Sequence, residues 1–65
     1  MENLKYRLAC AQSLIEDVIG SHQGGPTFAA RYALEQLVLP YEAEEVLLEY
    51  AKECERQLMR IIKNN

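Results

Sequence analysis

The segment from Pro26 to Leu39 constrains this chain more than any other, because as a helix it is apolar on two opposite faces. One face has the smaller or aliphatic residues Ala30, Ala33, Leu34 and Leu37. The opposite face has the larger residues Phe28, Tyr32 and Leu39. A helix that is apolar nearly all round is typical of a buried position. The segment therefore predicts contact with a partner protein, unless the two flanking helices enclose it completely.

Helices are also predicted on both sides of this segment, because apolar residues recur there at helical spacing. The first runs over about 2–19, and its apolar stripe is Leu4, Leu8, Ala11, Ile15 and Val18. The third runs over about 41–63, and its stripe is Ala43, Leu47, Ala51, Cys54, Leu58 and Ile61. The pattern predicts an all-α fold, a small three-helix bundle, with residues 1–65 forming a single helical domain.

Glycine and proline mark where these helices are expected to end. Gly20 is expected to cap the first helix in the left-handed conformation. The middle helix, over about 27–38, ends before Pro40, because proline disfavours a helical conformation in the residue that precedes it. Pro40 then either starts the third helix or kinks one continuous helix formed by the second and third, and both geometries stay open.

The small size of the chain favours association. A core built from 65 residues rarely supplies more than ~3–5 kcal/mol, and such chains usually add a disulfide, a metal ion or a partner. Cys10 and Cys54 are too few for a disulfide-rich secreted domain, and with His22 they lack the paired spacing of a metal site. No apolar run approaches the ~18–20 residues of a membrane span. We therefore expect a cytoplasmic protein that associates with itself or with another protein.

No arrangement of residues predicts an enzyme or a bound cofactor. His22 lies in the loop after the first helix, with no nucleophile or acid beside it, and is expected to be exposed. Cys10 is expected on the flank of the first helix, and Cys54 in the core, so neither resembles an activated nucleophile. Gly24 and Gly25 precede a helix but lack the lysine and serine or threonine of a phosphate loop.

Charge counts against nucleic acid as a partner. Ten acidic against seven basic residues give a net charge of −3, which phosphate backbones repel. The alternative is a small DNA-associated regulator resembling a helix-turn-helix protein. Its basic residues would gather at one end if the first and third helices were antiparallel, and these are Lys5, Arg7, Arg56, Arg60 and Lys63. The glutamates that open the third helix stand where a recognition helix would meet DNA.

The third helix separates its charges along its length. Glu42, Glu44, Glu45 and Glu49 precede a half in which four bases outweigh two acids. Two copies of this helix in antiparallel orientation would set opposite charges against each other, as in a two-fold homodimer.

The sequence therefore predicts a non-enzymatic interaction module of the adaptor, co-chaperone or inhibitor type, using an apolar helix face. The smaller face of the middle helix suits close packing inside the bundle, which leaves the larger face outward. Val46 and Leu48 broaden the apolar surface of the third helix. The predicted docking residues are Phe28, Tyr32, Leu39, Val46 and Leu48.

Overall fold

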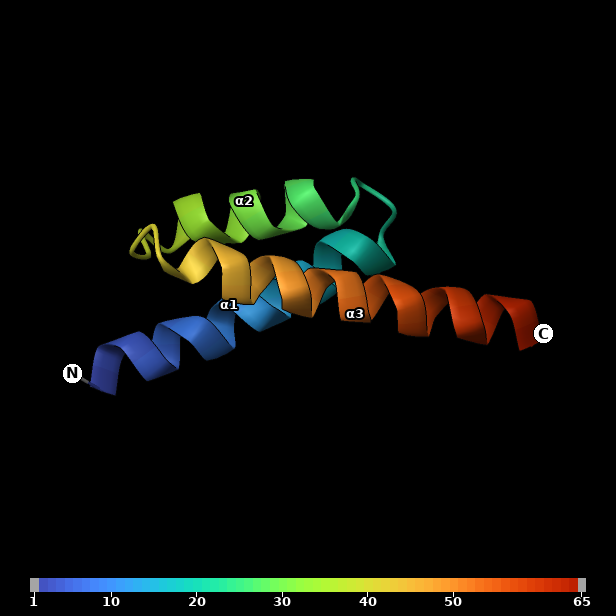
Figure 1. Ribbon diagram of the computed structural model, residues 1–65, viewed down its shortest axis with the longest axis horizontal. Coiled ribbons are helices and arrows are strands. Elements are labelled where there is room, and N and C mark those ends of the chain that lie inside the picture. Colours follow the sequence, from blue (N-terminus) through green and yellow to red (C-terminus); the bar gives the residue numbers. More distant parts are fainter. Residues whose placement is uncertain (1, 65) are drawn as a thin grey trace.

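The computed structural model describes residues 2–64 and, within them, the side chains of residues 5–63. It contains the helices α1 (Glu2–Gly20), α2 (Pro26–Gln36) and α3 (Ala43–Asn64). Figure 1 shows that α1 and α3 point in the same direction and that α2 runs back between their ends. Every pair of helices is in contact. The predicted all-α three-helix bundle is confirmed.

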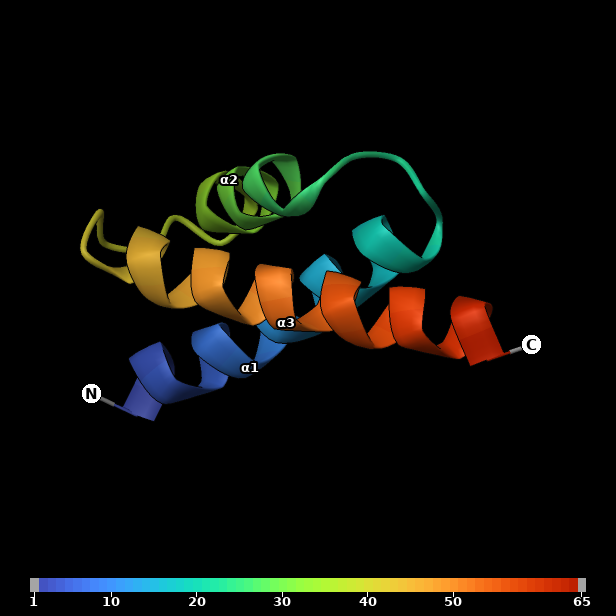
Figure 2. The same ribbon diagram turned by 45° about the vertical axis from the view of Figure 1, so that its right-hand side comes forward.

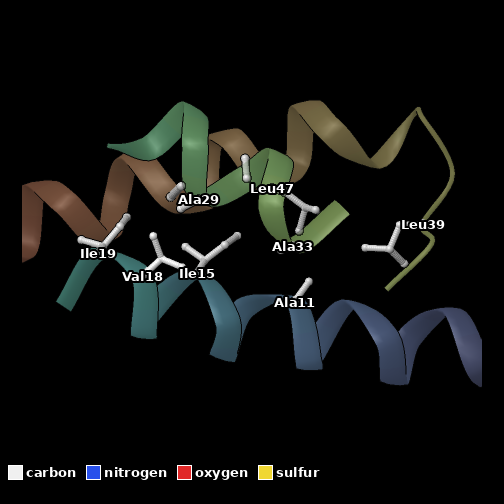
Figure 3. Packing of buried hydrophobic residues seen from close by; sticks show 10 residues of the cluster. Ala11, Ile15, Val18, Ile19, Ala29, Ala33, Leu39 and Leu47 are labelled. Atoms are coloured by element: carbon white, nitrogen blue, oxygen red, sulfur yellow. The ribbon is translucent and has the colours of Figure 1, made fainter. Parts of the chain in front are cut away.

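The core is made from short side chains that let the three helices approach closely. Half of its ten buried residues are alanines, and Ile15 and Leu47 are the largest side chains that are almost completely buried. Among the described residues no polar or charged side chain is buried, so apolar packing alone fills the core. The buried set, shown as sticks in Figure 3, is Ala11, Ile15, Val18, Ile19, Ala29, Ala30, Ala33, Leu39, Leu47 and Ala51.

Helix α1 ends in a Schellman motif, and its left-handed residue is His22 (φ 58°). The His22 amide donates to the Ile19 carbonyl, and the Gln23 amide donates to the Val18 carbonyl. These two bonds satisfy carbonyls that the end of a helix leaves without partners. The expectation that Gly20 takes the left-handed conformation is wrong, because the helix includes Gly20 and no described glycine has positive φ. Histidine tolerates this conformation better than most residues.

Helix α2 ends two residues earlier than predicted, in a second Schellman motif. The Val38 amide donates to the Glu35 carbonyl, and the Leu39 amide donates to the Leu34 carbonyl. Val38 is the left-handed residue (φ 50°), a conformation that branching at Cβ makes costly. The Arg7 guanidinium of α1 also donates to the Val38 carbonyl at 3.1 Å and places a positive charge at the negative end of α2.

Helices α2 and α3 are separate, so a continuous helix kinked at Pro40 does not occur, and α3 begins at Ala43, three residues after Pro40. A connection of non-helical residues, 37–42, separates the two helices. Two hydrogen bonds hold the last turn of this connection: the Ala43 amide donates to the Pro40 carbonyl, and the Glu44 amide donates to the Tyr41 carbonyl. Glu44 and Glu45 then occupy the first turn of α3, where they complement the helix dipole.

The molecule is elongated, with extents of 42 × 19 × 17 Å. Figures 1 and 2 show the start of α1 at one end and the final turns of α3 projecting past the other two helices at the opposite end. This projection explains why Ile61, predicted in the core stripe, is exposed. The side chain of Leu4, the first stripe residue of α1, lies outside the described residues.

Candidate functional site

Two aromatic rings form the most prominent feature of the outer face of α2. The rings of Phe28 and Tyr32 stack with centroids 6.0 Å apart and an interplanar angle of 22°. Phe28 is 50% exposed and Tyr32 38% exposed, so both rings face solvent as predicted. Gly24 leaves room for this pair, because a Cβ there would lie 2.3 Å from Cδ2 of Phe28.

The opposite face of α2 lies inside the bundle, as its small residues predict. Ala30 and Ala33 are buried, and Leu34 and Leu37 are partly buried against the core. Ala29 is buried as well, which helical spacing does not predict, because Ala29 lies between the two faces. Four apolar side chains on one side and an aromatic pair on the other make α2 two-faced in the folded chain.

Leu39 does not belong to the outer face, and its placement there is wrong. It is only 9% exposed and packs in the core. The reason is the early end of α2, after which the left-handed Val38 reverses the chain and brings Leu39 back toward the helices (Figure 3). Val38 takes the outward position instead and is 78% exposed.

Val46 and Leu48 lie on different sides of α3, because two positions along a helix are about 200° apart. Val46 lies on the side toward α1, where it lines an apolar depression with Leu8, Pro40 and Ala43. Leu48 lies on the side toward α2 and is partly buried against the core. On that side the Arg31 guanidinium forms an ion pair with the Glu44 carboxylate at 3.4 Å. The five predicted docking residues therefore do not form one surface.

A longer groove runs between the end of α1 and the second half of α3. It has a volume of about 370 Å³ and is lined by Glu16, Ile19, Gly20, Tyr50, Glu53, Cys54, Gln57, Leu58 and Ile61. The Tyr50 hydroxyl donates a hydrogen bond to the Glu16 carboxylate and thereby ties α3 to α1. That bond, together with partial burial, raises the pKa of Tyr50 above its ordinary value.

The cysteines differ less in exposure than the sequence suggested. Both Cys10 and Cys54 are free and half-buried. Cys54 is less enclosed than predicted because it lines this groove rather than the centre of the core. Burial still raises the pKa of the Cys54 thiol, so its thiolate is less populated at neutral pH.

The basic residues do not gather at one end of the molecule. Because α1 and α3 point in the same direction, Lys5 and Arg7 lie near the start of α1, away from the bases at the end of α3 (Figure 1). Near the end of α3, Arg56 donates to the Glu53 carboxylate at 2.6 Å, which lowers the pKa of Glu53. The geometry on which the DNA-binding alternative depended is therefore not present.

Within the described part of the chain, no three side chains of metal-binding type lie close enough together to hold an ion. None of the three helices, as far as they are described, is long and apolar enough to cross a membrane. No known protein family, curated protein or solved structure is significantly similar to this chain.

Proposed function

We propose that this chain is a non-enzymatic protein–protein interaction module that docks on a partner through the outer face of α2. The observation that carries the proposal is the stacked pair Phe28 and Tyr32, half-exposed on a helix whose other face forms the core. Aromatic residues are enriched at binding hot spots, because they bury a large area and lose little side-chain entropy. Phe28 and Tyr32 are the anchors of the proposed interface.

The surroundings of the pair suit a groove on a larger protein. Arg31 and Glu35 flank the rings on the same outer side of α2, and both are exposed. A pair of apolar anchors with a charged rim matches the way an amphipathic helix lies in a hydrophobic groove. This mode would serve an adaptor, a co-chaperone or an inhibitor, and two free thiols support a role in the reducing cytoplasm.

Capture of partners from the native host tests this proposal. The tagged protein is compared with Phe28→Ala and Tyr32→Ala variants and with Tyr6→Ala, a matched control because Tyr6 is an exposed tyrosine on α1. A partner of the α2 face should be retained by the wild type and the control, and lost from the other two. Circular dichroism establishes that each variant is folded.

Two results would contradict the proposal. One is a set of captured proteins that folded Phe28→Ala and Tyr32→Ala variants retain as fully as the wild type. The other is tight binding of duplex DNA at low salt that weakens steeply as salt rises, which is the behaviour of a nucleic-acid-binding protein.

A further inference from the structure

The side of the molecule opposite α2 has a second exposed apolar surface, along the contact between α1 and α3. It consists of two depressions on the same edge of α3. The first, of about 320 Å³, is lined by Leu8, Pro40, Glu42, Ala43 and Val46. The second is the groove described above, which ends at Ile61. Val46 is 59% exposed and Ile61 60% exposed, and the two lie ~22 Å apart along the helix at 1.5 Å per residue.

The folded chain exposes more surface than a monomer of its mass should. Its accessible surface is 4914 Å², whereas the scaling for monomeric proteins gives about 4250 Å² for 7.5 kDa. The excess of about 650 Å² per chain approaches the ~800 Å² that each partner buries in an interface of standard size. Association of two copies along this edge would remove a surface of the right magnitude.

The edge of α3 that borders the groove has the spacing of a helix–helix contact. Its residues recur at intervals of three and four, and they are Val46, Glu49, Tyr50, Glu53, Gln57, Arg60 and Ile61. They lie within an arc of about 120° at 100° per residue. The two ends of this edge are apolar, and its charges are acidic toward Val46 and basic toward Ile61.

These charges favour an antiparallel over a parallel orientation of a second copy. In a parallel pair each Glu49 would face the other Glu49, and each Arg60 the other Arg60, which is unfavourable. In an antiparallel pair centred between residues 54 and 55, Glu49 faces Arg60 of the other copy, and Val46 lies two residues from the position that faces Ile61. Glu53 and Arg56, which form an ion pair within one chain, then face each other across the axis as well. Both charge pairs therefore match in a single register, in which the apolar ends Val46 and Ile61 are offset from each other by about 3 Å along the helix.

We propose that a second copy of this chain occupies the α1–α3 edge, with the two α3 helices antiparallel, Glu49 of each copy facing Arg60 of the other, and Ile61 of each copy near Val46 of the other. This proposal rests on the proposed function as an interaction module. It adds that the α1–α3 side of the molecule is used for self-association. The Phe28–Tyr32 face of α2 stays free for another protein.

Reversal of one charge pair tests the register. Glu49→Lys and Arg60→Glu each place like charges opposite each other, and each should weaken the dimer about tenfold in Kd. The double variant reverses both partners and should restore the Kd to within about threefold of the wild type. Analytical ultracentrifugation measures the Kd, and circular dichroism confirms folding, since both side chains are exposed.

Chemical cross-linking tests the same contact independently. In a background with Cys10→Ser and Cys54→Ala, a chain with both Val46→Cys and Ile61→Cys should give a covalent dimer with a short bis-maleimide. Each single cysteine variant is the control and should cross-link poorly, because the antiparallel register places residue 46 near residue 61 of the other copy and far from the other residue 46. Within one chain the two positions are ~22 Å apart, too far for a short linker.

The proposal is overturned if the wild type sediments as a monomer at high micromolar concentration, or if the double charge variant is as weak as the singles. Efficient cross-linking of Val46→Cys alone would also overturn it. If instead Phe28→Ala and Tyr32→Ala dissociate the dimer, the second copy occupies the α2 face. If Phe28→Ala and Tyr32→Ala lose host partners while the dimer stays intact, both the docking face of α2 and the dimer along the α1–α3 edge are supported. The two proposals can therefore fail separately.

Discussion

Replacement of Val38 by glycine should stabilise this protein, although the change removes a whole side chain. Val38 has φ 50°, and the left-handed conformation costs an L-residue roughly 1–2 kcal/mol. The side chain is 78% exposed, so its removal sacrifices little packing. Glycine takes this conformation without strain but loses more entropy on folding, which costs roughly 0.5–1 kcal/mol.

The balance is a gain in the free energy of unfolding of about 1 kcal/mol. For a domain of this size such a gain raises the Tm by ~4–8 °C. Thermal and urea unfolding monitored by circular dichroism measure it. All variants must be compared at one protein concentration, because association also stabilises the folded state.

Two matched variants isolate the cause. Val38→Ala keeps the Cβ atom and should therefore gain much less than Val38→Gly. His22→Gly changes the other left-handed residue, where histidine is already better tolerated, and should gain less as well. Equal stability of Val38→Gly and Val38→Ala, or a loss in both, would refute the assignment of strain to Val38.

Four further perturbations test other contacts. Arg7→Met should lower the free energy of unfolding by about 0.5–1.5 kcal/mol in urea unfolding, because it removes the donor to the Val38 carbonyl at the end of α2. Gly24→Ala should displace the Phe28 ring and change the near-ultraviolet dichroism, whereas Gly25→Ala, where a Cβ meets no atom, should not. Because the pKa of Tyr50 is raised in the folded state, the stabilisation from its hydrogen bond to Glu16 is complete below pH ~10, the ordinary tyrosine pKa, and is lost as the pH rises above it. Tyr50→Phe should flatten this alkaline loss of stability, which thermal melts at several pH values measure. The Cys54 thiol, whose pKa burial raises, should react with a thiol reagent more slowly at pH 8 than Cys10, and single cysteine variants measure the two rates.

The helices and the inner face of α2 could be predicted from the sequence, because helical spacing decides which residues face inward. Ala30 and Ala33 on one side of α2 and Phe28 on the other follow from 100° per residue alone, and the structure confirms both positions. Periodicity locates a face well for as long as the helix continues.

The ends of the helices could not be predicted, because local residue preferences pointed elsewhere. Glycine at position 20 and proline at position 40 were the obvious signals, yet the chain reverses at His22 and Val38. Valine rarely adopts the left-handed conformation, so the residue at position 38 did not indicate that α2 ends before it. The position of Leu39 depended on that turn, which is why it was assigned to the wrong face.

The exposed end of α3 also lay beyond what periodicity can show. Leu58 and Ile61 continue the stripe that begins with Leu47, but a stripe does not reveal how far the neighbouring helices extend. Helix α1 ends at Gly20 and α2 begins at Pro26 near that end, so the last turns of α3 project past both helices (Figure 1). The length of a partner helix is a property of the whole fold rather than of the stripe.

The dependence of the Tm on protein concentration tests the central claim most directly, namely that association covers the apolar surface this small fold leaves exposed. If two copies associate, the Tm of the wild type should rise with concentration by mass action. In the Glu49→Lys variant the Tm should rise less, whereas Tyr6→Ala should match the wild type. A high Tm that does not change with concentration, together with a mass of 7.5 kDa throughout, would contradict the account.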